Sequence, residues 1–272
     1  MNKKKIIVTG GTDGIGLSLV RRLLNEDHNV YIIGKNPQKG NKLLNTLKNP
    51  KLEFFQCDLS EKKEIKKLIK DLNKLPEIDV LINNAGSVFD KRVVNNDGVE
   101  KTFALNHLSY FHLSLGLLDK LENSKDPRIV NVSSNAHKRY DIDINDLECK
   151  NRYSGWKAYC RSKLLNIFFT YSFKKKLKTK INSNCLHPGF VNSNFGNNND
   201  NFYRFVVNIM KNLFAISTET ASLSPFYLAL DPKLNETNGK YYYKLKEKKS
   251  CKESYNISLA DKIWNKSVEY IE

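Results

Sequence analysis

Five pairs of residues in this chain combine a tyrosine with a lysine four positions later, a spacing that puts both side chains on one face of a helix. A phenol beside an ammonium can transfer protons, because the positive charge favours the phenolate and lowers a pKa that is otherwise about 10. The pairs are Tyr31 and Lys35, Tyr153 and Lys157, Tyr159 and Lys163, Tyr171 and Lys175, and Tyr242 and Lys246. In a chain this rich in lysine, the spacing alone selects none of them.

The context along the chain favours Tyr159 and Lys163. They follow a predicted strand at residues 128–132, and Ser134 offers a hydroxyl just after that strand. Of the other four tyrosines, two fall in predicted strands, one precedes the predicted helix, and one lies about 18 Å further along it, at ~1.5 Å per residue. We therefore expect proton transfer at Tyr159.

Four of the 13 glycines fall within seven positions, where the first predicted strand meets the first predicted helix. They form the pattern Thr9-Gly10-x-x-x-Gly14-x-Gly16, with Gly11 beside the first of them. Residues without side chains let a pyrophosphate approach the backbone N–H groups at a helix N-terminus, where the partial positive charge favours an anion. The pattern indicates a dinucleotide site, and an ordinary tight turn is the alternative.

Lys35 follows the second predicted strand, residues 30–33, where dinucleotide folds often place an acidic residue that binds the ribose 2′-hydroxyl of NAD. A lysine at this position attracts the 2′-phosphate of NADP instead. The sequence therefore predicts NADP(H) as the cofactor, and the alternative is an ordinary solvated lysine.

Apolar runs alternate with helical patterns along the whole chain, and the predicted strands are residues 5–8, 30–33, 52–56, 80–82, 128–132, 181–186 and 240–243. Continuous β-branched strands between helices indicate a parallel sheet covered on both faces, and right-handed crossovers make it doubly wound. We predict an α/β fold, a three-layer Rossmann-like sheet of about seven strands in a single domain over residues 1–272. Ligands bind outside the carboxyl ends of such strands, where Asp58 and Asn84 also fall.

Composition limits the class of protein. The 272 residues are 40% hydrophobic, which supports one sizeable core, and no run approaches about 18 consecutive apolar residues. The five cysteines form no C-x-x-C motif, so neither a disulfide framework nor a metal site is expected. We expect a soluble cytoplasmic protein that contacts membranes at most peripherally.

The formal net charge is +16, from 45 basic and 29 acidic residues. Such an excess is typical of proteins that bind polyanions. Lysine and asparagine are abundant throughout the chain, however, and no motif with interleaved aromatic residues marks a nucleic-acid surface. A general compositional bias is therefore favoured over a dedicated nucleic-acid site.

Residues 190–215 differ from the rest of the chain. A polar, asparagine-rich stretch at 194–201 is followed by a segment that mixes large apolar side chains with basic ones. We interpret the region as a lid over an apolar pocket, lined by Phe195, Phe202 and Phe205. A buried helix, an oligomer contact or a membrane-dipping helix are the alternatives.

Together these residues resemble the short-chain dehydrogenase/reductase family, and within it the retinol dehydrogenase-like branch. The likeness spans essentially the whole chain. It rests on Thr9 to Gly16, Cys57-Asp58-Leu59, Asn83 to Gly86, Leu105-Asn106-His107, Asn131-Val132-Ser133-Ser134, Tyr159 to Lys163, His187-Pro188-Gly189, Gly239-Lys240-Tyr241-Tyr242 and Ala260 to Trp264.

The resemblance implies four catalytic residues. Tyr159 would be the general acid in carbonyl reduction and the base in alcohol oxidation, and Lys163 would hold the nicotinamide ribose hydroxyls. Ser134 would hydrogen-bond the substrate oxygen and stabilise the charge that develops on it. Asn106 would position a water that relays protons to Lys163.

The resemblance also implies a set of cofactor-binding residues, which includes Tyr159 and Lys163. The others are Thr9, Gly10, Thr12, Asp13, Gly14, Ile15, Gly16, Lys35, Asp58, Leu59, Asn84, Ala85, Gly86, Pro188, Gly189, Val191 and Ser193. Asp13 departs from the pattern, because some NADP enzymes carry a basic residue at that position. Lys35 stands where the branch usually has an arginine.

The function that follows is NADP(H)-dependent interconversion of a carbonyl and an alcohol on an apolar or lipid-like substrate. The resemblance further implies a homodimer through the helices that precede and follow the fifth strand. Three alternatives are an NAD-preferring dehydrogenase, a non-catalytic nucleotide-responsive scaffold of the same fold, and a polyanion binder that exploits the net charge.

Overall fold

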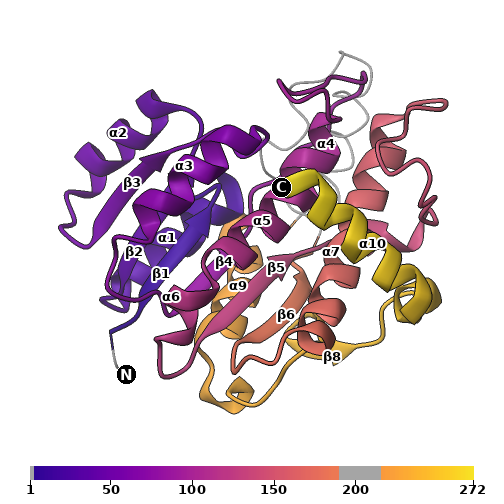
Figure 1. Cartoon of the computed structure of the whole chain (residues 1–272). Helices are drawn as coiled ribbons and strands as arrows, with labels where there is room; N and C mark the ends of the chain where they lie inside the picture. Colours follow the sequence, from indigo (N-terminus) through magenta and orange to yellow (C-terminus); the bar gives the residue numbers. More distant parts are fainter. Residues whose placement is uncertain (1–2, 190–215) are drawn as a thin grey trace.

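The computed structural model describes residues 3–189 and 216–272, and its centre is one eight-stranded sheet (Figure 1). The strands lie in the order β3-β2-β1-β4-β5-β6-β7-β8. Their bounds are β1 Lys5–Thr9, β2 Asn29–Gly34, β3 Leu52–Gln56, β4 Val80–Asn83, β5 Arg128–Val132, β6 Asn182–His187, β7 Tyr241–Tyr243 and β8 Lys246–Lys248. The first seven strands run parallel, and their order reverses between β1 and β4. The prediction of a doubly wound parallel sheet is confirmed.

Strand β8 was not predicted from the sequence. It pairs antiparallel with β7 through a two-residue turn at Lys244 and Leu245, both with positive φ. Its three residues, Lys246, Glu247 and Lys248, are all exposed. A strand with neither face buried lacks the apolar pattern by which strands are recognised.

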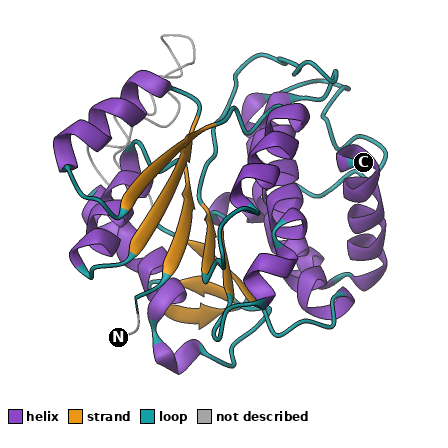
Figure 2. Cartoon of the chain, turned by 60° about the vertical axis from the view of Figure 1, so that its left-hand side comes forward, coloured by secondary structure: helices purple, strands orange, loops and turns teal. Residues whose placement is uncertain are grey.

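Helices cover both faces of the sheet, as Figure 2 shows. One layer consists of α1 (Gly14–Asn25), α2 (Pro37–Leu47) and α9 (Thr218–Leu230), and the other contains α3 (Lys62–Leu72), α5 (Ser109–Gly116), α6 (Leu118–Glu122) and α7 (Gly155–Lys176). Successive residues of β1 alternate between the layers: Ile6 and Val8 belong to the core beneath the first layer, and Ile7 to the core beneath the second. This arrangement confirms the predicted three layers.

The carboxyl ends of the central strands are tied together by buried polar side chains. The Thr9 hydroxyl at the end of β1 accepts hydrogen bonds from the backbone N–H groups of Asn84 and Ala85, just after β4. The Asn83 amide donates to the Asn131 side chain of β5 at 2.9 Å. These bonds fix the relative positions of the loops that leave β1 and β4.

The C-terminal helix α10 (Ile257–Ile271) lies against α7 and covers the face that α5 and α7 share (Figure 1). The Trp264 ring packs edge-on against Phe111 of α5, with centroids 4.8 Å apart, and stacks on Phe169 of α7 at 6.1 Å. The predicted dimer contact uses the same two helices. Because α10 covers these faces of α5 and α7, a dimer in which the two helices contact the partner directly would require α10 to move away.

Within the described ranges, no helix combines the length and the apolar character needed to cross a bilayer.

Candidate active site

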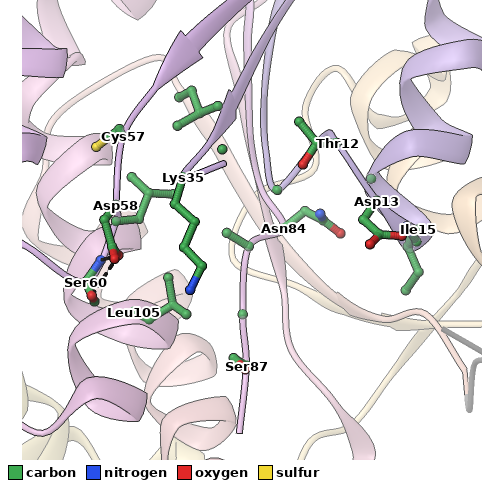
Figure 3. Close-up of a pocket in the computed structure, with 18 of the residues that line it drawn as sticks. Thr12, Asp13, Ile15, Lys35, Cys57, Asp58, Ser60, Asn84, Ser87 and Leu105 are labelled. Atoms are coloured by element: carbon green, nitrogen blue, oxygen red, sulfur yellow. Dashed lines mark hydrogen bonds between the residues drawn. The ribbon is translucent and has the colours of Figure 1, made fainter. Parts of the chain in front are cut away.

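A pocket of about 340 Å³ opens at the carboxyl ends of β1 to β4 (Figure 3). Twelve of the predicted cofactor-binding residues line it. They are Gly10, Thr12, Asp13, Gly14, Ile15, Gly16, Lys35, Asp58, Leu59, Asn84, Ala85 and Gly86. Residues from four separate loops thus converge at the point where the strand order reverses, which is where open α/β sheets bind ligands.

Eight further residues line the same pocket and were not predicted from the sequence. They are Ile33, Gly34, Cys57, Ser60, Ser87, Phe89, Lys101 and Leu105. Cys57 and Leu105 stand in motifs that carry the family resemblance, and Leu105 lies in the π-helical turn η1 (Ala104–Leu108). Four more, Ile33, Gly34, Ser60 and Ser87, lie within two positions of predicted residues, so extending each motif would have found them. No local motif marks Phe89, in the loop after β4, or Lys101, in α4 (Lys101–Phe103).

The glycines between β1 and α1 leave the pocket lining free of side chains, and they also allow close packing inside the protein. Gly10 and Gly14 have φ of +67° and +53°, in the left-handed region that favours glycine. A Cβ on Gly16 would lie 2.2 Å from the carbonyl oxygen of Gly10. Room for a pyrophosphate is therefore only part of the reason for this glycine, which also lets α1 pack against the preceding loop.

Asp13 caps the N-terminus of α1, and its carboxylate accepts a hydrogen bond from the Gly14 N–H at 2.8 Å. The carboxylate also pairs with the ammonium of Lys39, 2.6 Å away. Lys39 was not predicted, because nothing in the sequence shows that α2 brings its first turn to this cap. Asp13 stands where some NADP enzymes carry a basic residue, and Lys39 supplies a positive charge next to it.

Lys35 and Asp58 both project into the pocket in Figure 3. The Asp58 carboxylate accepts hydrogen bonds from the backbone N–H and the hydroxyl of Ser60, at 2.9 and 2.7 Å. These bonds hold the carboxylate at the start of the loop after β3. Lys35 directly follows the last residue of β2, as predicted.

Lys163 lies in the first half of α7, 3% exposed, and its ammonium donates to the carbonyl oxygen of Val132 at 3.0 Å. The ammonium nitrogen lies 5.7 Å from the ring centroid of Tyr159, and a Cβ on Gly86 would be 3.3 Å from it. Burial lowers the pKa of Lys163 to about 7. Lys163 therefore connects the phenol-bearing face of α7 with the floor of the pocket.

Tyr159 is partly exposed and its ring stacks on Trp156, with centroids 5.7 Å apart. Helix α7 begins at Gly155, after Ser154, whose hydroxyl accepts from the Lys157 N–H. Tyr153 precedes the helix, as predicted. The helix start thus places Tyr159 and Lys163 in consecutive turns, and the Lys163 ammonium reaches Val132, the last residue of β5.

Ser134 follows β5 and is partly exposed, and its hydroxyl accepts from the Ala136 N–H at 3.2 Å. Asn106 is fully buried in the turn η1. Its side chain accepts from the Ser87 N–H, donates to the Ser87 carbonyl, and donates to the Ser162 hydroxyl at 3.0 Å. Asn106 therefore joins the pocket loop after β4 to the helix that carries Tyr159.

The remaining predicted residues lie elsewhere. Thr9 is completely buried and is not among the residues that line the pocket; its hydroxyl accepts hydrogen bonds from the N–H groups of Asn84 and Ala85 and so positions them. Pro188 and Gly189 follow β6, and Gly189 has φ of +106°. Val191, Ser193 and the predicted lid with Phe195, Phe202 and Phe205 lie outside the described residues.

Comparison with protein families matches residues 4–203 to the short chain dehydrogenase family. Human polyprenol dehydrogenase is 34% identical over 276 residues, which cover 97% of this chain and 83% of the relative. Human retinol dehydrogenase 12 is 31% identical, with 98% and 86% covered, and the chloroplastic short-chain dehydrogenase TIC 32 A of Brassica napus is 32% identical, with 98% and 88% covered.

Solved structures have the same fold. An uncharacterised protein from Mycobacterium paratuberculosis aligns with a TM-score of 0.79 at 23% identity, covering 98% of this chain and 93% of that one. Serine dehydrogenase in complex with NADP+ aligns with a TM-score of 0.67 at 21% identity, covering 84% and 89%.

The chain belongs to the short-chain dehydrogenase family, in its retinol dehydrogenase-like branch. It is therefore an oxidoreductase for alcohols and carbonyls that uses a nicotinamide dinucleotide.

Proposed function

We propose that this protein is an NADP(H)-dependent oxidoreductase that interconverts a carbonyl and an alcohol on an apolar or lipid-like substrate, with Tyr159 as the general acid and base. The observation that carries the proposal is the position of Lys163. Its buried ammonium lies 5.7 Å from the ring centroid of Tyr159 and also beside Gly86, which lines the pocket. A positive charge there favours the phenolate of Tyr159 and so eases proton transfer at that oxygen.

The residues present fit a nicotinamide dinucleotide. The glycine turn leaves a floor without side chains beside the N-terminus of α1, and Gly86 leaves room beside the Lys163 ammonium. The bound dinucleotide would supply or accept the hydride. In reduction Tyr159 donates a proton to the substrate oxygen while the Ser134 hydroxyl hydrogen-bonds the same oxygen, and in oxidation Tyr159 accepts that proton.

Lys163 and Asn106 would support this proton transfer from different sides. Lys163 would bind the ribose hydroxyls next to the nicotinamide through its ammonium. Asn106 holds the loop after β4 against α7, and from there it would position a water that passes protons on to Lys163. The carboxamide end of the cofactor would contact the segment after β6, at Pro188, Gly189, Val191 and Ser193.

The charges around the adenosine end support NADP(H) over NAD(H). Among the described lining residues the carboxylates are Asp13 and Asp58. The first pairs with Lys39 and the second accepts two hydrogen bonds from Ser60, while Lys35 projects into the pocket. A 2′-phosphate would therefore meet lysine charges at this end of the site.

The names of the relatives support an apolar alcohol or aldehyde as substrate, because two of them are a polyprenol and a retinol dehydrogenase. Such molecules reside in membranes. We accordingly propose a cytoplasmic protein that contacts a membrane peripherally when it takes up its substrate. We also propose a homodimer, which would have to form with α10 in place over α5 and α7. Sedimentation of the full chain tests it, and a monomer alone would contradict it.

The test is NADPH and NADH oxidation with a panel of apolar aldehydes that includes retinal and a polyprenal. We expect turnover with NADPH, and a loss of about 10³-fold in Tyr159→Phe. Tyr31→Phe is the matched control, because Tyr31 is the phenol of another tyrosine–lysine pair and should leave turnover unchanged. Absence of turnover that depends on Tyr159 across the panel would favour a non-catalytic scaffold.

A further inference from the structure

A second pocket, of about 980 Å³, lies at the opposite end of α7 from Tyr159 and shares no lining residue with the first. Three separate segments form its walls: the last turns of α7, the hairpin of β7 and β8, and the chain from η4 (Lys252–Tyr255) into α10. Figure 1 shows β8 beside the ends of α7 and α10. None of these residues belongs to the proposed active site.

Lysine dominates the charge of this pocket. Seven lysines line it, Lys174, Lys175, Lys176, Lys240, Lys248, Lys249 and Lys252, against two carboxylates. The carboxylates are already paired, because Asp261 binds Lys176 at 2.6 Å and Glu247 binds Lys240 at 2.7 Å. Within the described ranges the other five lysines have no carboxylate partner, so the pocket holds about five uncompensated positive charges.

Tyrosines and serines form a fixed wall between these lysines. The rings of Tyr171 and Tyr255 stack with centroids 5.4 Å apart, and the Tyr171 hydroxyl shares a hydrogen bond with that of Ser250 at 2.8 Å. The Ser250 hydroxyl in turn lies 2.6 Å from that of Ser254. The wall joins α7 to the segment after β8, so the lysines of both segments face one stable concavity.

Lysines held around a concave wall of low dielectric attract anions more strongly than lysines on a flat surface do. We propose that this pocket binds a small ligand that carries about three phosphate groups. Each phosphate contributes about −1.5 to −2 charges at neutral pH, so three of them balance five lysines. The lysine ammonium is a suitable phosphate partner, as a compact point charge with three donors.

The volume narrows the class of ligand. A pocket of this size is typical of small-molecule sites, which range over about 300–1,000 Å³. A duplex nucleic acid would track a stripe of basic residues over the surface and would not enter such a hollow. A carboxylate-rich peptide carries one charge per side chain, and the pocket would need five acidic groups within the same space.

The experiment is calorimetric titration of the full chain with tripolyphosphate at physiological ionic strength. We expect saturable binding of one ligand per chain that weakens in Lys248→Glu/Lys249→Glu by at least tenfold. Lys63→Glu/Lys67→Glu on α3 changes the net charge equally at exposed positions away from the pocket, and should change the affinity less than threefold. Equal weakening by both pairs would overturn the proposal, because the net charge alone would then account for binding.

Two further arms separate binding in this pocket from a loss of folding and from binding in the first pocket. Lys248→Gln/Lys249→Gln repeats the test with smaller charge changes, with circular dichroism as the check of folding. Lys35→Glu changes a residue of the first pocket alone and should leave the tripolyphosphate affinity within threefold, since the two pockets share no residue. A loss of tenfold or more in Lys35→Glu would place the anion in the first pocket and contradict the assignment.

A vesicle-binding assay distinguishes a lipid headgroup from a dissolved ligand as the source of the phosphates. Binding to phosphatidylcholine vesicles that contain phosphatidylinositol bisphosphate would assign the site to a lipid headgroup, provided that Lys248→Glu/Lys249→Glu abolishes the binding. Binding only to free inositol phosphates would assign it to a dissolved ligand. Equal binding to poly-glutamate or to phosphatidylserine vesicles of matched charge would refute specificity for phosphate.

Discussion

The two pockets of this molecule are built by opposite means. The first is formed by loops at the ends of four neighbouring strands, and its described charged lining is balanced, with two lysines and two aspartates. The second gathers seven lysines from segments about 65 to 80 positions apart along the chain. A dinucleotide is thus met mainly by backbone groups that the fold fixes, whereas a polyanion is met by side chains that only the tertiary structure brings together.

The strongest expected effect concerns Lys163, which is buried, whereas none of the lysines that line the second pocket is buried. Lys163→Met should lower turnover about 10³-fold, because the charge that favours the Tyr159 phenolate is removed. The same change should raise the free energy of unfolding at pH 7 by roughly 2 kcal/mol, since a desolvated ammonium is replaced by an apolar side chain. Kinetics and urea denaturation measure the two quantities.

The lowered pKa of Lys163 also predicts how the free energy of unfolding changes with pH. The pKa of Lys163 is about 7 in the folded protein, below its ordinary value of 10.5, so the unfolded chain binds more protons between these values. The contribution of Lys163 to stability should therefore rise as the pH rises from 7 towards 10.5. Wild type should gain on Lys163→Met over this range, and a constant difference between them would contradict the burial argument.

A large effect is also expected at Gly16. Gly16→Ala puts a Cβ 2.2 Å from the Gly10 carbonyl oxygen, so the glycine turn must shift and NADPH affinity should fall about 100-fold. Gly98→Ala is the control for an added methyl group, because no atom lies within 4 Å of the added Cβ there, and NADPH affinity should be unchanged. A similar affinity loss in both variants would show that the close approach at Gly16 is not responsible.

A smaller effect is expected at Lys35. Lys35→Glu replaces attraction for a 2′-phosphate by repulsion, so the ratio of kcat/KM for NADPH to that for NADH should fall at least ~10-fold. Lys42→Glu, an exposed change on α2 outside the pocket, should leave the ratio unchanged. An unaltered ratio in Lys35→Glu would leave the NAD-preferring alternative standing.

The smallest effect is expected on NADPH affinity when the second pocket is changed. Lys248→Glu/Lys249→Glu should leave NADPH affinity within about twofold of wild type at physiological ionic strength, because exposed charges separated by more than ~10 Å are largely screened. Fluorescence titration of NADPH measures it. A tenfold loss would mean that the second pocket is coupled to the first.

The sequence predicted the features that depend on local patterns of residues better than those that depend on contacts between distant residues. Strands β1 to β7 were predicted within about one residue; β1, β2 and β4 are nearly continuous apolar runs, as buried parallel strands usually are. The loops at their ends followed from the topological rule for α/β sheets, and the glycine turn from its spacing.

Other features depend on contacts distant in sequence. Phe89 and Lys101 line the first pocket because the loop after β4 and the start of α4 lie beside it, which no local motif indicates. Lys39 meets Asp13 because α2 returns to the cap of α1. The lysines of the second pocket looked like compositional bias in the sequence, since no local pattern distinguishes Lys248 from the other lysines of the chain.

The most direct test of the account combines turnover and cofactor binding in Tyr159→Phe, which removes only the phenol oxygen. The account predicts that the rate of NADPH oxidation with the best aldehyde falls about 10³-fold while the Kd for NADPH stays within about threefold of wild type. Turnover within tenfold of wild type would contradict it, because the proton would then come from a group other than Tyr159.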